Sequence, residues 1–492
     1  MTSISLLPLF VMLIMFLFLT GLTSKQLHPE GGIEGLIREV KKRARKSRSV
    51  SEENLEVVNV EEHKLDYWHG FIPNEDTALI LKNDGDFLIR LLMEEPKPIC
   101  ISVREGAKVY NAIVNRTETG GFELAGIEYP SIKTMVDELQ VRKRPIQIDG
   151  AQVVLNCPVR RKQWELKHCM ITLGKRLGKG SYGSVYKGIL RKDRQTIDVA
   201  VKVLSDMSPE NSYALWKEAR VMQMYDHPHV VRMYGVANDT EPYYLVMELV
   251  SGGALNDFLK KKGRHAKTSK RVQILYEASL GIEYLHSRGC IHRDIAARNL
   301  LLDKVVKVAD FGLTRKSKSY KVNPDKPMNL RWLAPDVYHT GIVEKHTDVY
   351  AFGITMWEVF QIPYQIPYRE WNADEVYQNV VDGTYRLSPQ DIMPTDVASL
   401  FRECIAEPQL RPTFKSIVLF LKEGSVGTVT WLAILLFYNV PVERTAICTY
   451  KINAFCSNNL DYHLETPKKL LESSYINTTT QYVLLLSVVF RC

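Results

Sequence analysis

A glycine-rich segment limits the fold of this chain more than any other feature. Leu177–Val185 follows the pattern G-x-G-x-x-G-x-V, and it lies between two strand-like runs. Glycines have no side chains, so backbone N–H groups at such a turn can approach phosphate oxygens closely. The segment therefore predicts a β-rich unit that can bind a phosphate-bearing ligand.

A lysine on a strand-like run and a glutamate in a helical stretch follow the glycine-rich segment. Lys202 ends the strand-like run Val199–Lys202, and Glu218 lies in a helical stretch where it can pair with that lysine. Such a pair would hold the lysine amine toward the α- and β-phosphates of a nucleotide.

The run Ile291–Asn299 is followed eleven residues later by Asp310-Phe311-Gly312. With the glycine-rich segment and Lys202 before it, this order of motifs resembles the protein-kinase family. The resemblance implies a bilobal fold, with a β-rich N-lobe and an α-rich C-lobe, that uses ATP and Mg²⁺. In such a fold Asp294 accepts the proton of the substrate hydroxyl, while Asn299 and Asp310 hold Mg²⁺.

The same resemblance assigns two groups of residues. Those expected to act in catalysis are Lys202, Glu218, Asp294, Arg298, Asn299 and Asp310. Those expected to bind ATP are Leu177, Gly178, Lys179, Gly180, Ser181, Tyr182, Gly183, Ser184, Val185, Ala200, Lys202, Glu248, Val250 and Leu301.

Two segments indicate which hydroxyl is phosphorylated. Ala296 and Arg298 give the A-A-R arrangement of tyrosine kinases, where serine/threonine kinases usually have a lysine two residues after the catalytic aspartate. Leu330–Pro335 looks like the tyrosine-kinase segment that supports a flat phenol ring, and we call it the acceptor platform. Tyrosine residues of proteins are therefore the expected substrates.

Tyr320 lies ten residues after Asp310, in a stretch rich in Lys and Ser. A phosphate there could pair with Arg293 and with Lys316 or Lys318 and order the loop. We therefore expect autophosphorylation at Tyr320. The alternative is an ordinary exposed tyrosine.

The resemblance extends to structural positions of the kinase fold. It makes Glu248–Val250 the adenine hinge and Met247 the bulky residue that guards the pocket behind it. Asp348 and Arg411 are expected to be structural residues of the C-lobe. Asp336 stands where kinases usually have a glutamate paired with the equivalent of Arg411, and its shorter side chain could loosen that pair.

A smaller α+β module precedes the kinase-like region. Short β-like runs at 87–90, 99–103 and 109–114 lie between helical stretches at 74–81 and 131–140. With Tyr67–Gly70 and Phe87–Arg90, the module resembles a Src-homology-2 (SH2) domain, in which a central antiparallel sheet is flanked by two helices. The strand arginine of that family, here Arg90, binds phosphotyrosine.

Three departures from the SH2 pattern weaken this site. Asn74 replaces a second arginine, Leu91 and Leu92 replace the polar start of the phosphate loop, and Asn111 stands where histidine is common. The alternative role for Arg90 is that of a buried structural arginine without a ligand.

The order of the two modules and their junction resemble the Fes/Fer group of non-receptor tyrosine kinases. The similar segments are Trp164–His168, Leu215–Arg220 and Asp226-His227-Pro228. The resemblance covers Tyr67 to about Glu423. It does not include the membrane-binding and coiled-coil region of long Fes/Fer proteins, because the 66 residues before Tyr67 contain no heptads.

The chain begins with an uncharged apolar segment, Ile4–Leu22, whose 19 residues nearly match a membrane-spanning helix. A cleaved signal peptide, or a start region outside the working protein, is the alternative. Arg38–Arg48 contributes +6 of the net charge of +8, so the remaining charge does not favour nucleic-acid binding. The tract would keep the following domains in the cytosol, unless it is only a solvated linker.

The predicted organisation has five parts. These are an apolar segment (1–24), a basic tract and linker (25–66), an SH2 domain (67–158), a tyrosine kinase domain (164–423) and an unassigned tail (424–492). We expect a non-receptor tyrosine kinase at the cytosolic face of a membrane, with phosphotyrosine proteins as SH2 partners. The alternatives are a receptor-like kinase and a phosphotyrosine-binding scaffold with an inactive kinase fold.

Overall fold

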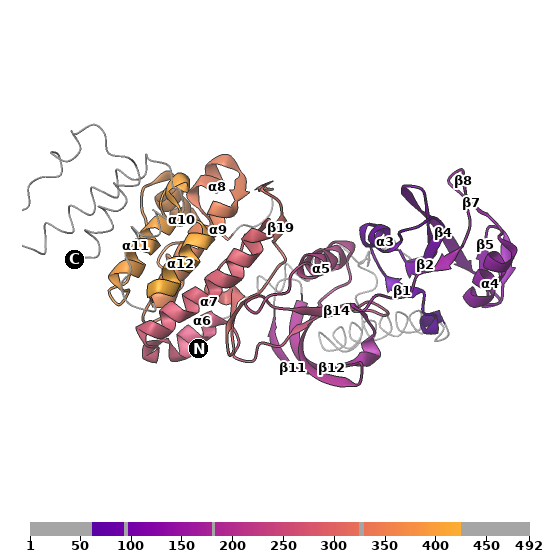
Figure 1. Ribbon diagram of the computed structural model, residues 1–492, viewed down its shortest axis with the longest axis horizontal. Coiled ribbons are helices and arrows are strands. Elements are labelled where there is room, and N and C mark those ends of the chain that lie inside the picture. Colours follow the sequence, from indigo (N-terminus) through magenta and orange to yellow (C-terminus); the bar gives the residue numbers. More distant parts are fainter. Residues whose placement is uncertain (1–61, 93–96, 180–182, 324–328, 425–492) are drawn as a thin grey trace, which may run out of the picture.

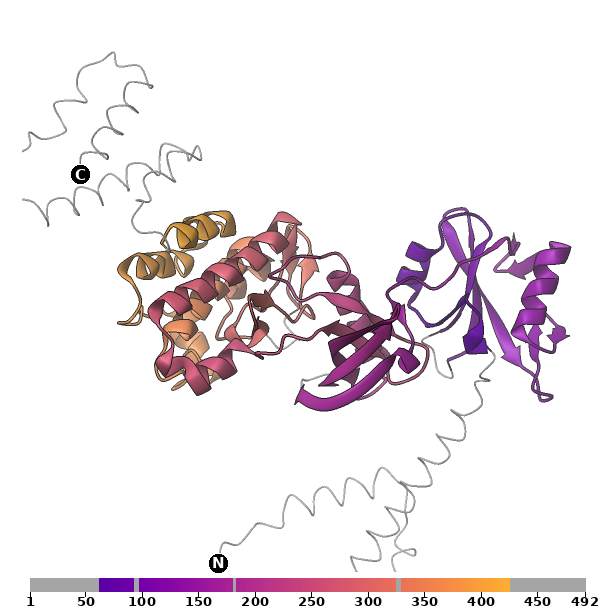
Figure 2. The same ribbon diagram turned by 60° about the horizontal axis from the view of Figure 1, so that its bottom comes forward.

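The folded units of the chain lie in a row in the computed structural model (Figures 1 and 2). The structure describes residues 62–92, 97–179, 183–323 and 329–424. The first unit, at one end of the row, is followed by a β-rich lobe and then by a helical lobe. Helix α5 (Pro209–Met222) of the β-rich lobe contacts the first unit through Trp216 and Arg220.

The first unit is built on a twisted sheet with the order β1-β2-β3-β4-β5-β6, and β9 also pairs with β2. The central strands β2, β3 and β4 are antiparallel, whereas β1 and β9 run parallel to β2. The strands of this sheet are β1 (Trp68–Phe71), β2 (Asp86–Leu91), β3 (Ile99–Glu105), β4 (Lys108–Arg116), β5 (Phe122–Leu124), β6 (Ile127–Tyr129) and β9 (Cys157–Pro158). A separate pair is formed by β7 (Ile146–Ile148) and β8 (Ala151–Val153).

Two helices, α3 (Asn74–Ile80) and α4 (Ile132–Arg142), accompany this sheet. The Ser131 side chain caps α4 by accepting the backbone N–H of Thr134, which satisfies a donor that has no partner within the helix. The helix buries Ile132, Met135, Val136 and Leu139, the spacing that forms one apolar face. This face joins the core of the first unit.

The β-rich lobe contains a second sheet with the order β10-β14-β15-β13-β12-β11. Its strands are β10 (Glu165–Leu166), β11 (Ile171–Lys179), β12 (Gly183–Lys192), β13 (Gln195–Leu204), β14 (Met233–Ala237) and β15 (Tyr244–Glu248). Strand β13 lies between β12 and β15, so Lys202 sits opposite Val185 and Leu245. The lysine is therefore fixed at the centre of the sheet.

The helical lobe forms the other end of the row. Its helices are α6 (Leu255–Lys262), α7 (Thr268–Ser287), α8 (Pro335–Thr340), α9 (Lys345–Phe360), α10 (Ala373–Val376), α11 (Thr395–Cys404) and α12 (Phe414–Gly424). Three short strand pairs join β16 (Cys290–Ile291) to β19 (Arg315–Lys316), β17 (Leu300–Leu302) to β18 (Val306–Val308), and β20 (Ser319–Lys321) to β21 (Ile342–Glu344). All residues of α9 from Thr347 to Phe360 are buried, so this helix is the centre of the lobe.

Aromatic side chains join the first unit to the β-rich lobe. Phe71 of β1 stacks on Tyr243, with 4.9 Å between ring centroids and planes 7° apart. It also contacts Trp216 of α5 at 6.3 Å. Phe71, Leu81 and Leu88 belong to the same buried cluster as Trp216, so one apolar cluster includes residues of both units.

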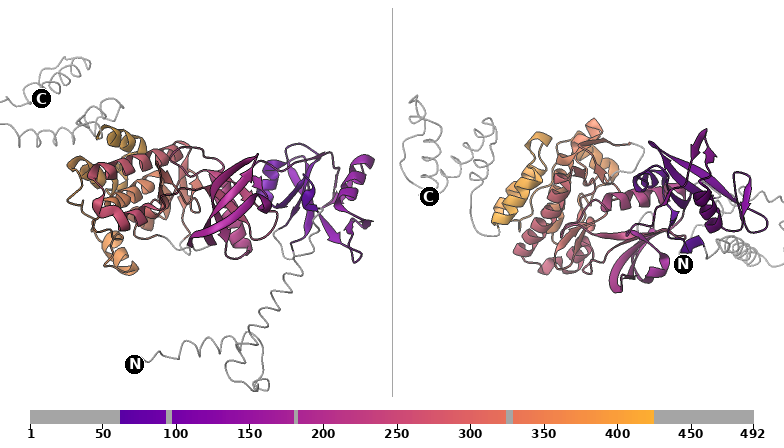
Figure 3. Two further views of the ribbon diagram at one scale, coloured as in Figure 1. Left: turned by 90° about the horizontal axis from the view of Figure 1, so that it is seen from below. Right: turned by 45° about the vertical axis from the view of Figure 1, so that its right-hand side comes forward.

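Polar contacts reinforce this junction. Arg220 of α5 donates two hydrogen bonds to Asp76 of α3, at 2.9 and 2.6 Å. The buried Asn238 donates its amide to the carbonyl oxygens of His69 and Phe71, both at 2.7 Å. Figure 3 shows, from two further directions, the first unit against the side of the lobe that carries α5.

The predicted fold class is confirmed. Helices predicted at 74–81 and 131–140 correspond to α3 and α4, and the three strands predicted at 87–90, 99–103 and 109–114 correspond to β2, β3 and β4. The apolar segment Ile4–Leu22, the tract Arg38–Arg48 and residues 425–492 lie outside the described residues. Within the described residues, no helix is long and apolar enough to cross a membrane.

Candidate active site

The glycine-rich segment connects two antiparallel strands at the edge of the lobe. Gly178 of β11 pairs with Val185 of β12, and residues 180–182 between them lie outside the described residues. A Cβ atom at Gly183 would lie 2.1 Å from the carbonyl oxygen of Val203, so a side chain there would displace β13. A Cβ at Gly178 would meet no described atom within 4 Å, which leaves this backbone open to a ligand.

The predicted lysine–glutamate pair is formed. Lys202 Nζ lies 2.6 Å from Glu218 Oε2, and only 6% of the glutamate side chain is exposed. Burial raises the pKa of Glu218, the charge of Lys202 lowers it, and the nearby Asp310 carboxylate raises it again. Asp310 therefore faces the same space as the ion pair.

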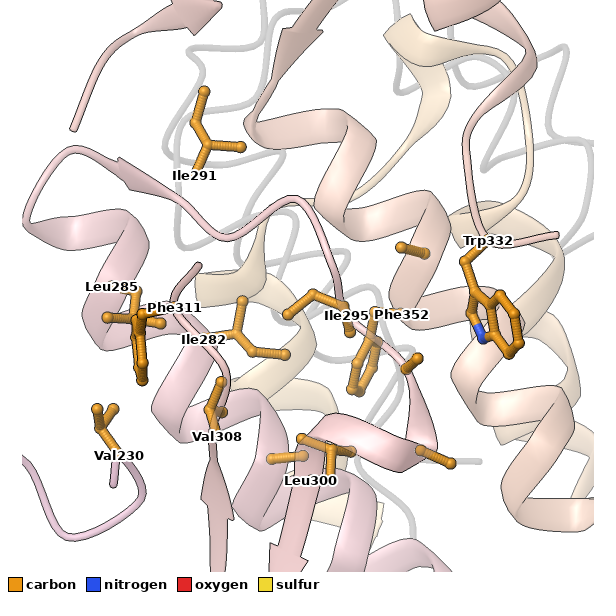
Figure 4. Close-up of a cluster of buried hydrophobic side chains, with 14 of the residues drawn as sticks. Val230, Ile282, Leu285, Ile291, Ile295, Leu300, Val308, Phe311, Trp332 and Phe352 are labelled. Atoms are coloured by element: carbon orange, nitrogen blue, oxygen red, sulfur yellow. The ribbon is translucent and has the colours of Figure 1, made fainter. Parts of the chain in front are cut away.

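The segment 310–312 is anchored by its phenylalanine. Phe311 is 1% exposed and belongs to the buried cluster drawn in Figure 4. Its ring packs against His292, with 5.5 Å between centroids, and against Tyr225 at 6.4 Å. Asp310 itself is exposed, and its φ angle of 63° places it in the left-handed region. The buried ring thus leaves the neighbouring carboxylate open to the site.

A buried carboxylate fixes the backbone of the predicted catalytic loop. Asp348, in the first turn of α9, accepts the backbone N–H groups of His292 and Arg293, both at 2.8 Å, and a ring nitrogen of His286 lies 2.9 Å from it. Burial opposes ionisation of Asp348, but its interactions with His286 and His292 outweigh burial and lower its pKa. The aspartate is ionised and holds the loop in one position.

Asp294 is surrounded by hydrogen-bond donors. Arg298 Nη2 and Asn329 Nδ2 donate to its Oδ1 atom, the latter at 2.9 Å, and Asn299 Nδ2 donates to Oδ2 at 2.7 Å. Because its amide nitrogen donates to Asp294, Asn299 has its amide oxygen available for another ligand. Asn299 is buried. Its side-chain carbonyl oxygen and the Asp310 carboxylate are the kind of oxygen ligands that a hard cation such as Mg²⁺ prefers.

The acceptor platform is tied to the catalytic loop. The guanidinium carbon of Arg298 lies 4.5 Å from the ring centroid of Trp332. The buried Glu358 accepts both the Trp332 indole N–H at 2.8 Å and the Ala297 backbone N–H at 3.0 Å. Trp332 is the ring drawn beside the cluster in Figure 4.

The remaining predicted nucleotide contacts lie on the facing strands of the two lobes. Ala200 is on β13, opposite Met247 of β15, and Leu301 is on β17. Glu248 ends β15, its carboxylate lies 3.0 Å from Lys307 Nζ, and Val250 is buried. The contact of Glu248 with Lys307 joins β15 of the β-rich lobe to β18 of the helical lobe.

Arg90 occupies a separate place in the first unit, on β2. It is 2% exposed and donates to Ser102 Oγ at 2.7 Å, to the Ile72 carbonyl at 2.6 Å, and to both Asn74 and Asn111. The two asparagines that depart from the SH2 pattern are therefore hydrogen-bond acceptors for this arginine. Burial lowers the pKa of Arg90.

Tyr320 lies on β20, opposite Val343 of β21. The guanidinium carbons of Arg293 and Arg315 lie 4.2 and 5.2 Å from its ring centroid. Sequence reasoning named Arg293 but missed Arg315, and it also missed the contact of Asn329 with Asp294. No motif marks either residue, because both contacts depend on how distant segments meet.

The comparisons with known proteins agree with this geometry. The family model described as protein tyrosine and serine/threonine kinase matches residues 171–421, and the SH2 domain model matches residues 67–139. The human tyrosine-protein kinase Fer is 33% identical over 78% of this chain and 47% of its own length.

Two further relatives show the same similarity. The transforming protein Fps of avian sarcoma virus (strain PRCII), a tyrosine-protein kinase, is 33% identical over 71% of this chain and 66% of its own length. The spermatocyte protein spe-8 of Caenorhabditis elegans is 31% identical over 73% of this chain and 71% of its own length. The chain spans about half the length of the human Fer kinase that it matches.

Asp336 makes the ion pair that its short side chain was expected to loosen. Its Oδ1 atom accepts a hydrogen bond from Arg411, and His346 Nε2 lies 3.1 Å from its Oδ2 atom. Burial raises the pKa of Asp336, but hydrogen bonds from His346 and Arg411 outweigh it and lower the pKa to about 2 from 3.8.

Because the folded-state pKa is depressed, the carboxylate stabilises the fold above pH 3.8, and this contribution is lost as the pH falls toward 2. We expect Asp336→Asn to lower the free energy of unfolding by about 2 kcal/mol at pH 7, and the deficit to shrink below about pH 4. Denaturant unfolding of the full chain across this pH range measures it. Asp391→Asn, at an exposed carboxylate, is the control, and a deficit that does not change with pH would contradict the assignment.

Proposed function

The chain belongs to the tyrosine kinases of the protein-kinase family and carries an SH2 domain, and we propose that it transfers the γ-phosphate of ATP to tyrosine hydroxyls of proteins. The observation that carries this proposal is the joint presence of the Lys202–Glu218 ion pair and the hydrogen-bonded Asp294. Phosphoryl transfer depends mainly on positioning and on charge stabilisation, and these two groups supply both.

Each residue has a distinct proposed task. Lys202 holds the α- and β-phosphates, and Glu218 keeps its amine in place. Asp294 accepts the proton of the tyrosine hydroxyl, while the platform beside Arg298 supports the phenol ring. Asn299 and Asp310 would hold Mg²⁺, which neutralises charge on the phosphates when it is bound.

The remaining nucleotide contacts follow from the two lobes. We propose that the backbone of Leu177–Val185 covers the phosphates and that Ala200, Leu301 and the hinge residues Glu248 and Val250 enclose the adenine. Of the residues that the structure describes here, all but Val250 lie on β11 to β13, β15 and β17, which supports this. The division into an SH2 domain at 67–158 and a kinase domain at 164–423 is part of the same proposal.

The SH2 domain is proposed to bind phosphotyrosine through Arg90. A phosphate oxygen can replace Asn74 or Asn111 as the acceptor for the Arg90 guanidinium, because all three groups accept the same N–H donors. With asparagine in place of the second arginine, the phosphate meets fewer charged donors, so the binding is weaker than in an SH2 domain with two arginines.

Autophosphorylation is proposed at Tyr320. A phosphate on this tyrosine would add nearly two negative charges beside Arg293 and Arg315, whose guanidinium groups already contact the ring. The new ion pairs would fix the strand pair β20–β21. We place the enzyme at the cytosolic face of a membrane, which the uncharged Ile4–Leu22 and the basic Arg38–Arg48 support.

Two substitutions separate catalysis from nucleotide binding. Asp294→Asn removes the proton acceptor but no phosphate contact, so we expect at least a hundredfold loss of kcat, about 3 kcal/mol, with ATP affinity nearly unchanged. Lys202→Met removes a phosphate contact and is expected to impair transfer to a similar extent. Steady-state assays with a Glu/Tyr copolymer, together with nucleotide-binding titrations, measure both. Full activity of either variant would refute the assignment.

Arg90→Lys keeps the positive charge but loses the planar fork of donors. We expect it to reduce retention of a phosphotyrosine peptide pool by at least tenfold, as measured by affinity capture on the purified full chain. Arg142→Lys, at a mostly exposed side chain of α4, serves as the matched control and should bind as the wild type does. Equal retention by the Arg90 variant, or equal retention of the unphosphorylated pool, would assign Arg90 a purely structural role.

Tyr320→Phe keeps the ring between Arg293 and Arg315 but cannot accept a phosphate. Preincubation with ATP should raise the turnover of the wild type severalfold and leave that of the variant unchanged. Progress curves recorded before and after preincubation measure this difference. If both proteins respond equally, Tyr320 is an ordinary surface tyrosine.

A further inference from the structure

We propose that Asn329 is a positioning residue for the proton acceptor, which holds one oxygen of Asp294 so that the other faces the acceptor hydroxyl. This inference rests on the proposed kinase function. It concerns a residue that lies 35 positions from Asp294 in sequence and outside the motifs of the catalytic loop. The contact is a single hydrogen bond of 2.9 Å from Asn329 Nδ2 to Asp294 Oδ1.

The chemistry of the contact fixes its direction. An ionised carboxylate only accepts hydrogen bonds, so the amide of Asn329 must present its NH₂ group to Asp294. Two other side chains that contact the Asp294 carboxylate are also donors, since Arg298 donates to Oδ1 and Asn299 donates to Oδ2.

A count of lone pairs then distinguishes the two oxygens. Each carboxylate oxygen offers two lone-pair sites. Among the described residues, Arg298 and Asn329 occupy both sites of Oδ1, and Asn299 occupies one site of Oδ2. The structure therefore assigns the remaining site, on Oδ2, to the acceptor hydroxyl.

In the proposed phosphoryl transfer, Oδ2 of Asp294 takes the proton of the phenol. The phenol oxygen forms a bond to the γ-phosphorus. The bond between the γ-phosphorus and the bridging oxygen breaks, and ADP leaves with its electron pair. Asn329 takes no part in these bond changes and only keeps the carboxylate from rotating.

Asn329 can do this because its own position is fixed. The backbone carbonyl oxygen of Asn329 accepts the backbone N–H groups of Trp332 at 3.0 Å and of Leu333 at 3.2 Å. These bonds close a turn at the start of the acceptor platform. Two residues after Asn329, the Arg331 side chain donates to the backbone carbonyl oxygens of Pro367, Tyr368 and Trp371.

The helical lobe thus holds the platform in place. Asn329, the residue just before the platform, donates a hydrogen bond to the Asp294 carboxylate. The ring of Trp332 and the carboxylate of Glu358 tie the same platform to Arg298 and Ala297. The surface that supports the substrate ring and the group that takes its proton therefore move as one body.

The test compares three substitutions at Asn329 in the full-length protein. Asn329→Ala removes the donor, and we expect kcat for a tyrosine peptide to fall about tenfold while the KM for ATP stays within twofold. Asn329→Asp keeps the shape but places a second carboxylate beside Asp294, so its kcat should fall further. Asn329→Gln retains an NH₂ group and should recover part of the lost rate.

The matched control is Asn83→Ala, since the Asn83 amide also donates to a carboxylate, that of Asp86 at 3.3 Å, but lies in the SH2 domain. It should leave kcat unchanged. Melting temperatures of all variants separate misfolding from loss of positioning, and the isosteric aspartate variant keeps the test valid if the alanine variant melts early.

The same experiment separates failure of the positioning role of Asn329 from failure of the proposed kinase function. If the wild type transfers no phosphate, the proposed function fails. If the wild type is active and Asn329→Ala matches its kcat, or if kcat and the KM for ATP worsen together with the melting temperature in every variant, the positioning role is wrong.

Discussion

The ion pair between Lys202 and Glu218 is the interaction on which the rest of the structure depends. It joins the centre of a sheet to a helix across 2.6 Å, with most of both side chains buried. A carboxylate that is so well buried is costly to leave unpaired, so α5 has to stay against β13 for the site to remain assembled. The position of α5 therefore decides whether the phosphates of a nucleotide meet their lysine.

The SH2 domain packs on α5, the helix that carries Glu218. Trp216 and Arg220 lie on the same helix as Glu218, and they contact Phe71 and Asp76 of the SH2 domain. Because Phe71 packs between Trp216 and Tyr243, separating the domains would expose its ring to water. The helix that carries Glu218 is thus held by contacts with both the sheet and the SH2 domain.

Features that a short stretch of sequence determines could be predicted, whereas contacts between distant segments could not. The glycine-rich segment, Lys202, Asp294 and Asp310 could be proposed as site residues because short motifs mark them in the sequence. The helix α4 could be found because its apolar residues Ile132, Met135, Val136 and Leu139 recur at helical spacing.

Contacts between distant side chains could not be found in this way. Asn329, Asn238 and Arg315 act through partners on other segments, and no spacing or periodicity marks such a contact. The departure at Asp336 was interpreted as a loosened ion pair, yet the backbone brings Arg411 within reach and His346 adds a second partner. A side-chain length does not predict a distance that the fold itself can adjust.

The most direct test of the account is the identity of the phosphorylated residue. The purified full chain would be incubated with ATP and Mg²⁺ and a peptide that carries tyrosine, serine and threonine in the same flanking sequence, and the products would be resolved by phosphoamino-acid analysis. The account predicts phosphotyrosine, and its loss in the Asp294→Asn variant. Phosphoserine or phosphothreonine as the main product, or the absence of any transfer by the wild type, would contradict it.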